Sequence, residues 1–294
     1  MTFAAIALPA AVVWIAVTPL HGKLVVAGNS NPGQTCAYLT VDPVSRHSSL
    51  RKGTCAIFGY RVYWNGRQPW TDVYVGPHLA FRYQDASDTR PMSAMSGDAL
   101  WIYDVATERG PILQRWSRAT GTLQQEIRLP VRLFRPVVAA NKAGAWLMAA
   151  PNGGEDGSGT VALWHVTSSG VTSVQRGSRA ALWMAARGRT LWLETVTGTR
   201  VFKLWRYDGT RGRLLWTRRH SYLMGPTFGG GSLWSLSGRY CATSVNVDRL
   251  DPSTGAIATV ATVPQLDCNQ LGPGAYLDGA FWFVNGNELQ RVPG

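Results

Sequence analysis

The strongest constraint on the fold is a phrase that recurs along the chain. It is clearest as RLDPSTGAI, which starts at Arg249. Six further copies, some of them imperfect, start at Thr40, Arg82, Arg115, His165, Arg206 and Arg291. Successive copies start 42, 33, 50, 41, 43 and 42 residues apart, so one repeat takes about 42 residues. A chain with this period is expected to fold as similar units, each packed against its neighbours.

A second phrase comes before the better copies and predicts a buried strand. Examples are GRTLWLET around Trp192, GGSLWSLS around Trp234 and DGAFWFV around Trp282. Glycine supplies the positive φ that a tight turn needs, and the apolar, aromatic run after it is typical of a strand. Each repeat then reads as a first strand, a Gly turn, a second strand with the Trp, a third strand ending in the Arg-x-Asp-Pro phrase, a Thr-Gly turn and a fourth strand.

Four strands in about 42 residues are the length of one propeller blade. The sequence therefore predicts an all-β, seven-bladed β-propeller of four-stranded antiparallel blades, as a single domain over residues 1–294. The 32 Gly, 16 Pro and 13 Trp, with only 16% charged residues, agree with a turn-rich chain that buries aromatic side chains.

The N-terminal segment has two interpretations. The last copy stops in a third strand, Glu288 to Val292, so the seventh blade lacks a fourth strand. We predict that TFAAIALP, Thr2 to Pro9, supplies it and closes the propeller, because propellers commonly close with a terminal strand. The alternative is a signal peptide or anchor, since residues 3–20 are apolar, although they lack a positively charged start.

Four cysteines indicate an oxidising compartment. Cys36 and Cys55 flank the third and fourth strands of the first blade, and Cys241 and Cys268 hold the same places in the sixth. We predict two disulfides, Cys36 to Cys55 and Cys241 to Cys268, and an extracytoplasmic location, secreted or at the cell surface. Export then needs a signal peptide or membrane anchor upstream of this sequence. Four buried free thiols are the alternative.

The repeat resembles those of known propellers. The G-x-LW strand followed by R-x-D-P-x-T-G is similar to the repeats of streptogramin-lyase-type and quinoprotein-like β-propellers. The resemblance implies the fold, while propellers of this kind host lyases, hydrolases, oxidoreductases and binding modules. DGTRGRLLW, from Asp208, approaches the quinoprotein docking phrase D-x-x-T-G-x-x-x-W with Arg211 in place of the Thr. No segment matches the His and acid set of streptogramin lyases, so we expect no metal and no cofactor.

The positive charge favours an anionic partner. The chain has 29 Lys and Arg against 17 Asp and Glu, a net charge of +12. Several basic residues fall where a fourth strand connects to the next blade: Arg128, Arg132, Arg135, Arg176, Arg179, Arg218, Arg219 and His220. We predict that they form a positive collar near a central channel that binds carboxylate or phosphate groups. The alternative is that these side chains pair with acids or only keep the protein soluble.

Other candidates are weaker. Trp64, Trp70 and Tyr74 could form an aromatic platform for a carbohydrate, although core aromatics are the simpler interpretation. The acidic loop NGGEDGSG, residues 152–159, lacks the ligand spacing of a calcium loop. The histidines are isolated in sequence, and His165 stands where the repeat has Arg, which indicates a structural role.

These features predict an extracytoplasmic, monomeric binding or scaffold module. Its partner is expected to be an anionic polymer, an acidic glycan or a protein, without specific binding to nucleic acid and with a possible membrane tether upstream. An enzyme resembling streptogramin lyase, or one acting on carbohydrates, is the alternative. The side chains present do not decide whether the protein is an enzyme, and they favour a non-catalytic role.

Overall fold

The computed structural model describes most of the chain. The described residues are 4–9, 12–20, 22–30, 35–53, 60–65, 68–75, 78–84, 92–96, 99–104, 111–117, 120–130, 137–141, 143–149, 161–177, 180–197, 201–219, 222–238, 242–266 and 274–294. All regular secondary structure in these ranges is β-strand. Within them, no helix is long and apolar enough to cross a membrane.

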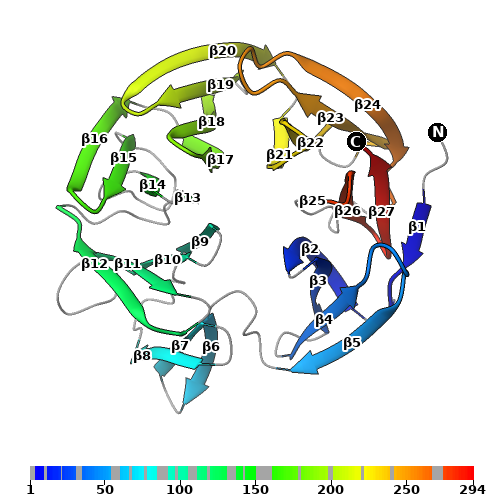
Figure 1. Cartoon of the computed structure of the whole chain (residues 1–294), viewed down its shortest axis with the longest axis horizontal. Helices are drawn as coiled ribbons and strands as arrows, with labels where there is room; N and C mark the ends of the chain where they lie inside the picture. Colours follow the sequence, from blue (N-terminus) through cyan, green and yellow to red (C-terminus); the bar gives the residue numbers. More distant parts are fainter. Residues whose placement is uncertain are drawn as a thin grey trace. The chain divides into compact units, whose positions relative to one another are not determined.

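The strands group into two compact units. We call Met1–Thr54 with Leu215–Gly294 the terminal unit, and Cys55–Leu214 the middle unit. The terminal unit holds three four-stranded sheets (Figure 1). Their strands, in sheet order, are β2 (Val12–Leu20), β3 (Lys23–Ser30), β4 (Thr35–Val41) and β5 (Ser48–Gly53); β21 (Tyr222–Gly229), β22 (Ser232–Gly238), β23 (Ser244–Leu250) and β24 (Ile257–Pro264); and β1 (Ala4–Ala7), β27 (Glu288–Pro293), β26 (Ala280–Asn285) and β25 (Ala275–Leu277).

The other four sheets lie mainly in the middle unit. Three have four strands, and one has three within the described residues. They are β6 (Tyr60–Asn65), β7 (Gln68–Val75) and β8 (His78–Gln84); β9 (Met92–Ser96), β10 (Ala99–Asp104), β11 (Ile112–Ser117) and β12 (Leu123–Arg128); β13 (Val137–Asn141), β14 (Gly144–Ala149), β15 (Val161–Thr167) and β16 (Gly170–Gly177); and β17 (Ala180–Arg187), β18 (Thr190–Thr197), β19 (Val201–Asp208) and β20 (Arg211–Arg219). β20 crosses the division between the units.

The predicted strand order is confirmed. In the four-stranded sheets built from consecutive strands, the first to the fourth strand pair in chain order and antiparallel. The repeated Trp lies on the second strand, as in Trp101 of β10, Trp192 of β18 and Trp234 of β22. The all-β propeller blade is therefore present, while a single domain over residues 1–294 stays a prediction.

The Asp-Pro phrase forms the turn between the third and fourth strands because its aspartate accepts backbone hydrogen bonds. Asp251 Oδ1 accepts from the amides of Ser253 at 2.8 Å and Thr254 at 2.7 Å. Gly255 follows at a φ of 74°. In the first repeat, Asp42 makes the same turn, and Arg46 stands in place of the glycine at a φ of 58°, a conformation that is uncommon for a residue with a side chain.

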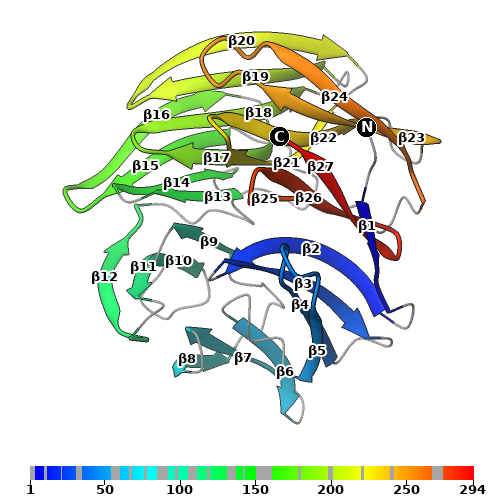
Figure 2. The same cartoon turned by 45° about the vertical axis from the view of Figure 1, so that its right-hand side comes forward.

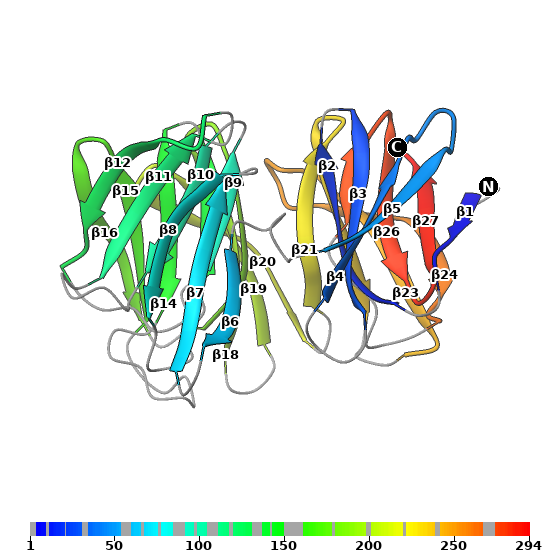
Figure 3. The same ribbon diagram turned by 90° about the horizontal axis from the view of Figure 1, so that it is seen from below.

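The N-terminal strand completes the last sheet. β1 pairs antiparallel with β27, with Ala4 opposite Arg291 and Ala7 opposite Glu288 (Figure 3). The amide of Leu8 also donates to the carbonyl of Asn287 at 2.8 Å. Ile6 and Leu8 pack into the core with Trp282. The interpretation of this segment as a strand of the last blade is confirmed, and residues 12–20 are the first strand of the next sheet, as predicted.

The core lies between neighbouring sheets of each unit. In the terminal unit, Trp234 of β22 packs against Tyr276 and Phe281 of the next sheet, with ring centroids 5.5 and 5.9 Å apart. In the middle unit, Trp146 of β14 packs in one cluster with Leu191 and Tyr207 of the sheet β17–β20. Figure 2 shows these two sheets of the middle unit stacked on each other. The second-strand Trp is thus the main contact from one sheet to the next.

Candidate functional site

The basic residue of the repeat phrase is a partner of the second-strand Trp. The strand register places Trp101 opposite Arg115, Trp192 opposite Arg206, and Trp282 opposite Arg291. The guanidinium carbons lie 5.9, 6.0 and 5.7 Å from the ring centroids. These are cation–π distances. The arginines of the phrase therefore hold the third strand against the second, which gives them a structural role.

His165 takes the arginine position in the sheet β13–β16, as predicted. It lies opposite Trp146, and the two rings stack with their centroids 3.9 Å apart and an angle of 15° between their planes. Burial lowers the pKa of His165, and the positive charge of Arg189 lowers it further. The structural role inferred for His165 from the repeat is confirmed.

The predicted anion-binding residues fall at the ends of fourth strands. Arg128 is the last residue of β12 and Arg219 the last of β20, and both side chains are exposed. Arg176, opposite Ala162, is the last but one of β16. Arg132, Arg135, Arg179 and His220 lie outside the described residues. A basic residue thus lies at the end of the fourth strand, or next to it, in three successive sheets, and the predicted collar around a channel stays a prediction.

Arg218 differs from its neighbours because it rests on an aromatic ring. Its guanidinium carbon lies 5.0 Å from the ring centroid of Trp216, two residues earlier on β20. The side chain is half-buried, whereas Arg219 beside it is exposed. Stacking of this kind leaves the guanidinium edge free to donate hydrogen bonds. Together with Arg128, Arg176 and Arg219, Arg218 forms the set that we call the strand-end arginines.

The candidate carbohydrate platform is placed only by its backbone. Trp64 lies in β6 opposite Pro69, and Trp70 lies in β7 opposite Tyr63. Tyr74, also in β7, is opposite Leu79 of β8. The acidic loop of residues 152–159 lies outside the described part of the chain. The platform stays a prediction.

The cysteines are described only at Cys36. It lies at the start of β4 rather than in the connection before it, because the strand pairing extends to Ser30 opposite Thr35. Cys36 is opposite Gly53, the last residue of β5. Cys55, Cys241 and Cys268 lie outside the described residues. Both disulfides stay predictions, although the register brings the end of β5 beside Cys36.

Two buried acids were not singled out from the sequence. Glu194 of β18 accepts a hydrogen bond from Trp183 Nε1 at 2.6 Å. Asp248 of β23 accepts from the hydroxyls of Ser237 and Thr259, the latter at 2.8 Å. Each carboxylate is bound by donors of its own sheet, an arrangement that stabilises a buried acid. The only sequence signal was an acidic residue within a predicted strand.

Neither acid belongs to a group with metal-binding chemistry. Within the part of the chain that the structure describes, no three His, Cys, Asp or Glu side chains gather as metal ligands. The sequence DGTRGRLLW forms the turn from β19 into β20, in which Asp208 accepts a hydrogen bond from Thr190 Oγ1 at 2.8 Å. In this chain the segment is a blade turn like the others, and the resemblance to quinoproteins and streptogramin lyases at this finer level stays a hypothesis.

Comparison with known proteins defines the fold. No family model matches the sequence, and no curated protein does. A chain of the mitotic checkpoint complex aligns with a TM-score of 0.60 at 10% identity, over 99% of this chain and 94% of that one. The β-propeller domain of the Trilobed protease from Pyrococcus furiosus, described as having an open velcro topology, aligns with a TM-score of 0.57 at 10% identity, over 94% of each chain.

A third solved structure shows the same architecture inside a longer protein. A puromycin-hydrolyzing peptidase of Mycobacterium tuberculosis aligns with a TM-score of 0.52 at 11% identity, over 93% of this chain and 50% of that one. At these identities the similarity concerns the fold alone. The chain has a β-propeller fold, a class in which function depends on the side chains each protein places on a common scaffold.

Proposed function

We propose that this protein is a binding module for an anionic polymer, an acidic glycan or an acidic partner protein. The observation that carries the proposal is that a strand-end arginine lies at the end of the fourth strand, or next to it, in three successive sheets. Arginine binds carboxylate, sulfate and phosphate groups through paired hydrogen bonds. One charged group per repeat is suited to a ligand with regularly spaced negative charges.

The net charge of +12 supports the same proposal. A surplus of this size raises the local concentration of anionic partners and speeds their association, with an effect that falls as salt rises. The repeat arginines stacked on Trp rings contribute to this field, although their position serves the fold. The strand-end arginines are then the residues placed to contact the ligand directly.

Retention on immobilised heparin tests the proposal. The strand-end variant R128Q/R176Q/R218Q/R219Q is expected to elute at a clearly lower salt concentration than the wild-type protein, because each lost contact weakens salt-dependent binding. A matched variant with four other basic residues replaced, K23Q/R46Q/K203Q/R249Q, controls for the change in net charge; like the strand-end variant, it includes one half-buried residue, Lys203. Equal elution of both variants would contradict the proposal.

We also propose an extracytoplasmic location, on the grounds of the paired cysteine positions. The disulfides Cys36 to Cys55 and Cys241 to Cys268 would each link the ends of one blade. A mass measured under non-reducing conditions should be lower than that of the reduced protein by four hydrogen atoms, two for each disulfide. Four thiols that react with an alkylating reagent in the native, unreduced protein would contradict this proposal.

A further inference from the structure

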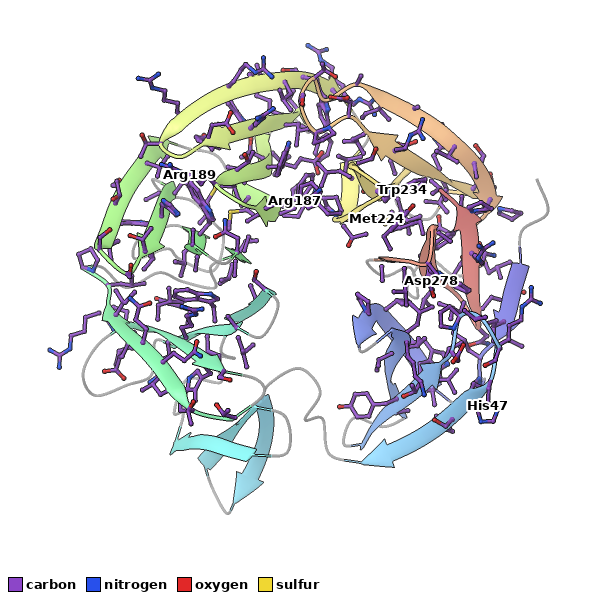
Figure 4. All side chains as sticks on the ribbon, in the orientation of Figure 1. His47, Arg187, Arg189, Met224, Trp234 and Asp278 are labelled. Carbon is purple, nitrogen blue, oxygen red and sulfur yellow. The ribbon has the colours of Figure 1, made fainter. Side chains whose placement is uncertain are left out.

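A second group of arginines lies at the other end of one sheet. The sequence Arg-Gly-Arg occurs twice in the sheet β17–β20, as Arg187 to Arg189 at the β17–β18 turn and as Arg211 to Arg213 at the start of β20. Turns from the first to the second strand and from the third to the fourth lie at the same end of such a sheet. Figure 4 labels Arg187 and Arg189 at this end. All these residues belong to the middle unit.

The two turns are tied to each other. The amide of Gly209, in the β19–β20 turn, donates to the carbonyl of Arg189, in the β17–β18 turn, at 3.2 Å. The register places Arg187 opposite Thr190, and Thr190 opposite Asp208, in one row across three strands. Gly188 and Gly209 have φ values of 58° and 62°, which suit tight turns. The arginines therefore stand on a fixed framework.

A close contact further defines the β19–β20 turn. A Cβ atom added to Gly212 would lie 2.4 Å from the ring of Tyr207, so the ring packs directly on the glycine backbone. Tyr207 is buried in the cluster that joins this sheet to β13–β16. The position of Arg211 and Arg213, on either side of Gly212, is thereby linked to the core of the middle unit.

The charge at this end of the sheet is strongly positive. The two turn segments, residues 187–190 and 206–213, contain one acid, Asp208, and five arginines, which we call the arginine-turn surface: Arg187, Arg189, Arg206, Arg211 and Arg213. Asp208 Oδ1 accepts from Nε and Nη2 of Arg206 at 3.3 and 3.2 Å. The other four arginine side chains are exposed. With five arginines and one aspartate, the two segments carry a formal net charge of 5 − 1 = +4.

Two titratable groups sense this charge. Desolvation acts to raise the pKa of Asp208, but hydrogen bonds from Thr190 and Arg206 and the charges of Arg206 and Arg213 lower it overall. The pKa of His165 is lowered by burial and, in addition, by the charge of Arg189. A positive potential lowers the pKa of an acid and of a base alike. The contributions of these arginines therefore agree with a positive field over the turn end.

We infer that the arginine-turn surface is a second anion-binding site, which takes a polymer bearing phosphate groups. Every cation of the surface is Arg, whose planar fork donates two parallel hydrogen bonds to a phosphate, whereas Lys offers a point charge. Thr210, exposed in the turn beside Arg211, adds a neutral hydroxyl donor. The site is separate from the strand-end arginines and does not depend on them.

The spread of the arginines favours a polymer over a single small anion. Arg187 on β17 and Arg211 on β20 are on the outer strands of a four-stranded sheet, about 14 Å apart at the usual spacing between strands. One phosphate carries about two negative charges, fewer than the formal charge of +4 on the two turns, so a single phosphate does not neutralise the surface. A chain of linked phosphates can contact several guanidinium groups at once, and it gains affinity from each release of bound counterions.

The test measures the binding of fluorescent inorganic polyphosphate by anisotropy over a series of salt concentrations. In the turn variant R187Q/R189Q/R211Q/R213Q, affinity should fall at least about tenfold, and the slope of log Kd against log salt should become shallower by about one for each lost contact. Arg206 is kept because it pairs with Asp208. The variant K23Q/R46Q/K203Q/R249Q, with the same change of net charge and all strand-end and turn arginines kept, should bind polyphosphate within about threefold of wild type. Matching circular dichroism spectra and melting temperatures confirm that each variant is folded.

Three outcomes would overturn the inference. Equal losses in the turn variant and in K23Q/R46Q/K203Q/R249Q would show an effect of net charge alone. A turn variant that binds polyphosphate as tightly as the wild type does would show that the arginine-turn surface is not the binding site. If polyglutamate binds the wild type as tightly as polyphosphate does, and the turn variant loses this binding, the site recognises carboxylate groups and not phosphate in particular. The lysine variant R187K/R189K/R211K/R213K keeps the charge and should still lose affinity, because it lacks the fork. Heparin retention of the strand-end variant is a separate readout, so the two proposals can fail independently.

Discussion

The terminal and middle units place the same Trp in different surroundings. In the terminal unit, Trp234 Nε1 donates to the carbonyl of Gly229 at 3.1 Å, and Trp282 Nε1 to that of Leu277 at 3.2 Å, in both cases five residues earlier. In the middle unit, the buried indole nitrogens of Trp101 and Trp146 have no hydrogen-bond partner among the described residues. The repeat therefore determines where the Trp ring lies, but it does not determine whether the indole N–H has a hydrogen-bond acceptor.

The turn before the Trp accounts for part of this difference. In the terminal unit, both central residues of the turn have positive φ, at Gly230 and Gly231 and again at Asp278 and Gly279. The carbonyl just before each turn accepts the indole hydrogen bond. Before Trp146, the side chain of Asn141 instead accepts from the amides of Ala143 and Gly144, at 2.8 and 3.0 Å. The two units thus build a similar hairpin with different hydrogen bonds.

The units also differ in how a sheet is completed. Each four-stranded sheet lying mainly in the middle unit is built from consecutive strands, whereas the last sheet of the terminal unit takes β1 from the opposite end of the chain. Deletion of residues 1–9 should therefore have the largest effect. It removes the burial of Ile6 and Leu8 and leaves β27 as an open edge, at a cost of roughly 5 kcal/mol.

Calorimetry of the deletion variant checks this. A loss of that size should lower the melting temperature by roughly 10 °C or more. Deletion of residues 1–3 alone, which keeps β1, serves as the control. An unchanged melting temperature for the longer deletion would contradict the role of β1 in the last sheet.

Two glycines distinguish the packing of the units. A Cβ atom on Gly229, in the terminal unit, would lie 1.8 Å from the ring of Tyr276, while one on Gly144, in the middle unit, would lie 2.1 Å from the carbonyl oxygen of Val166. G229A and G144A should each destabilise the protein by about 3 kcal/mol in urea unfolding, since neither contact can be kept.

A second substitution at the contacted residue should restore stability in one of these variants and not in the other. Y276A should recover part of the loss caused by G229A, because the clash is with a side chain, and a double-mutant cycle measures this coupling. V166A should recover nothing in G144A, because the clash there is with the backbone. Additive effects in the first pair would show that Tyr276 moves aside without cost.

Trp-to-Phe substitutions test the hydrogen-bond difference itself. W234F removes a made hydrogen bond, and W146F removes a donor that has no partner. Both lose ring volume, so the comparison isolates the N–H group. We expect W234F to lower the free energy of unfolding by about 1 kcal/mol more than W146F, as measured by urea titration. The reverse order would mean that Trp146 Nε1 is satisfied in solution.

The sequence predicted the fold well because each repeat carries the same local signals for its turns and strands. The strand order, the Asp-Pro turn and the Trp on the second strand depend on short-range patterns, and the pairing of β1 with β27 was predicted from the fourth strand that the last repeat lacks. The buried Glu194 and Asp248 were missed, because a single acid in a strand does not reveal its donors. The arginine-turn surface was missed because its two Arg-Gly-Arg segments, 24 residues apart, meet only through strand pairing and the bond from Gly209 to Arg189.

The smallest predicted effect concerns His165, the one repeat position where the middle unit replaces Arg by a titratable ring. Its pKa is lowered in the folded protein from the ordinary value of 6.5, so the unfolded chain binds a proton more readily. Stability from this group is therefore complete above about pH 6.5. It is lost as pH falls from there toward the lowered pKa of the folded state.

Urea unfolding between pH 5 and pH 8 measures this dependence. In H165Q, the fall in stability below about pH 6.5 should become shallower, whereas H47Q, which removes an exposed histidine of the β4–β5 turn, should follow the wild type. H165R restores the arginine of the other repeats and should also lose the pH dependence, because its charge does not titrate in this range. An unchanged slope in H165Q would place the titrating group elsewhere. It would also show that proximity to Arg189 and burial against Trp146 do not shift His165 in solution.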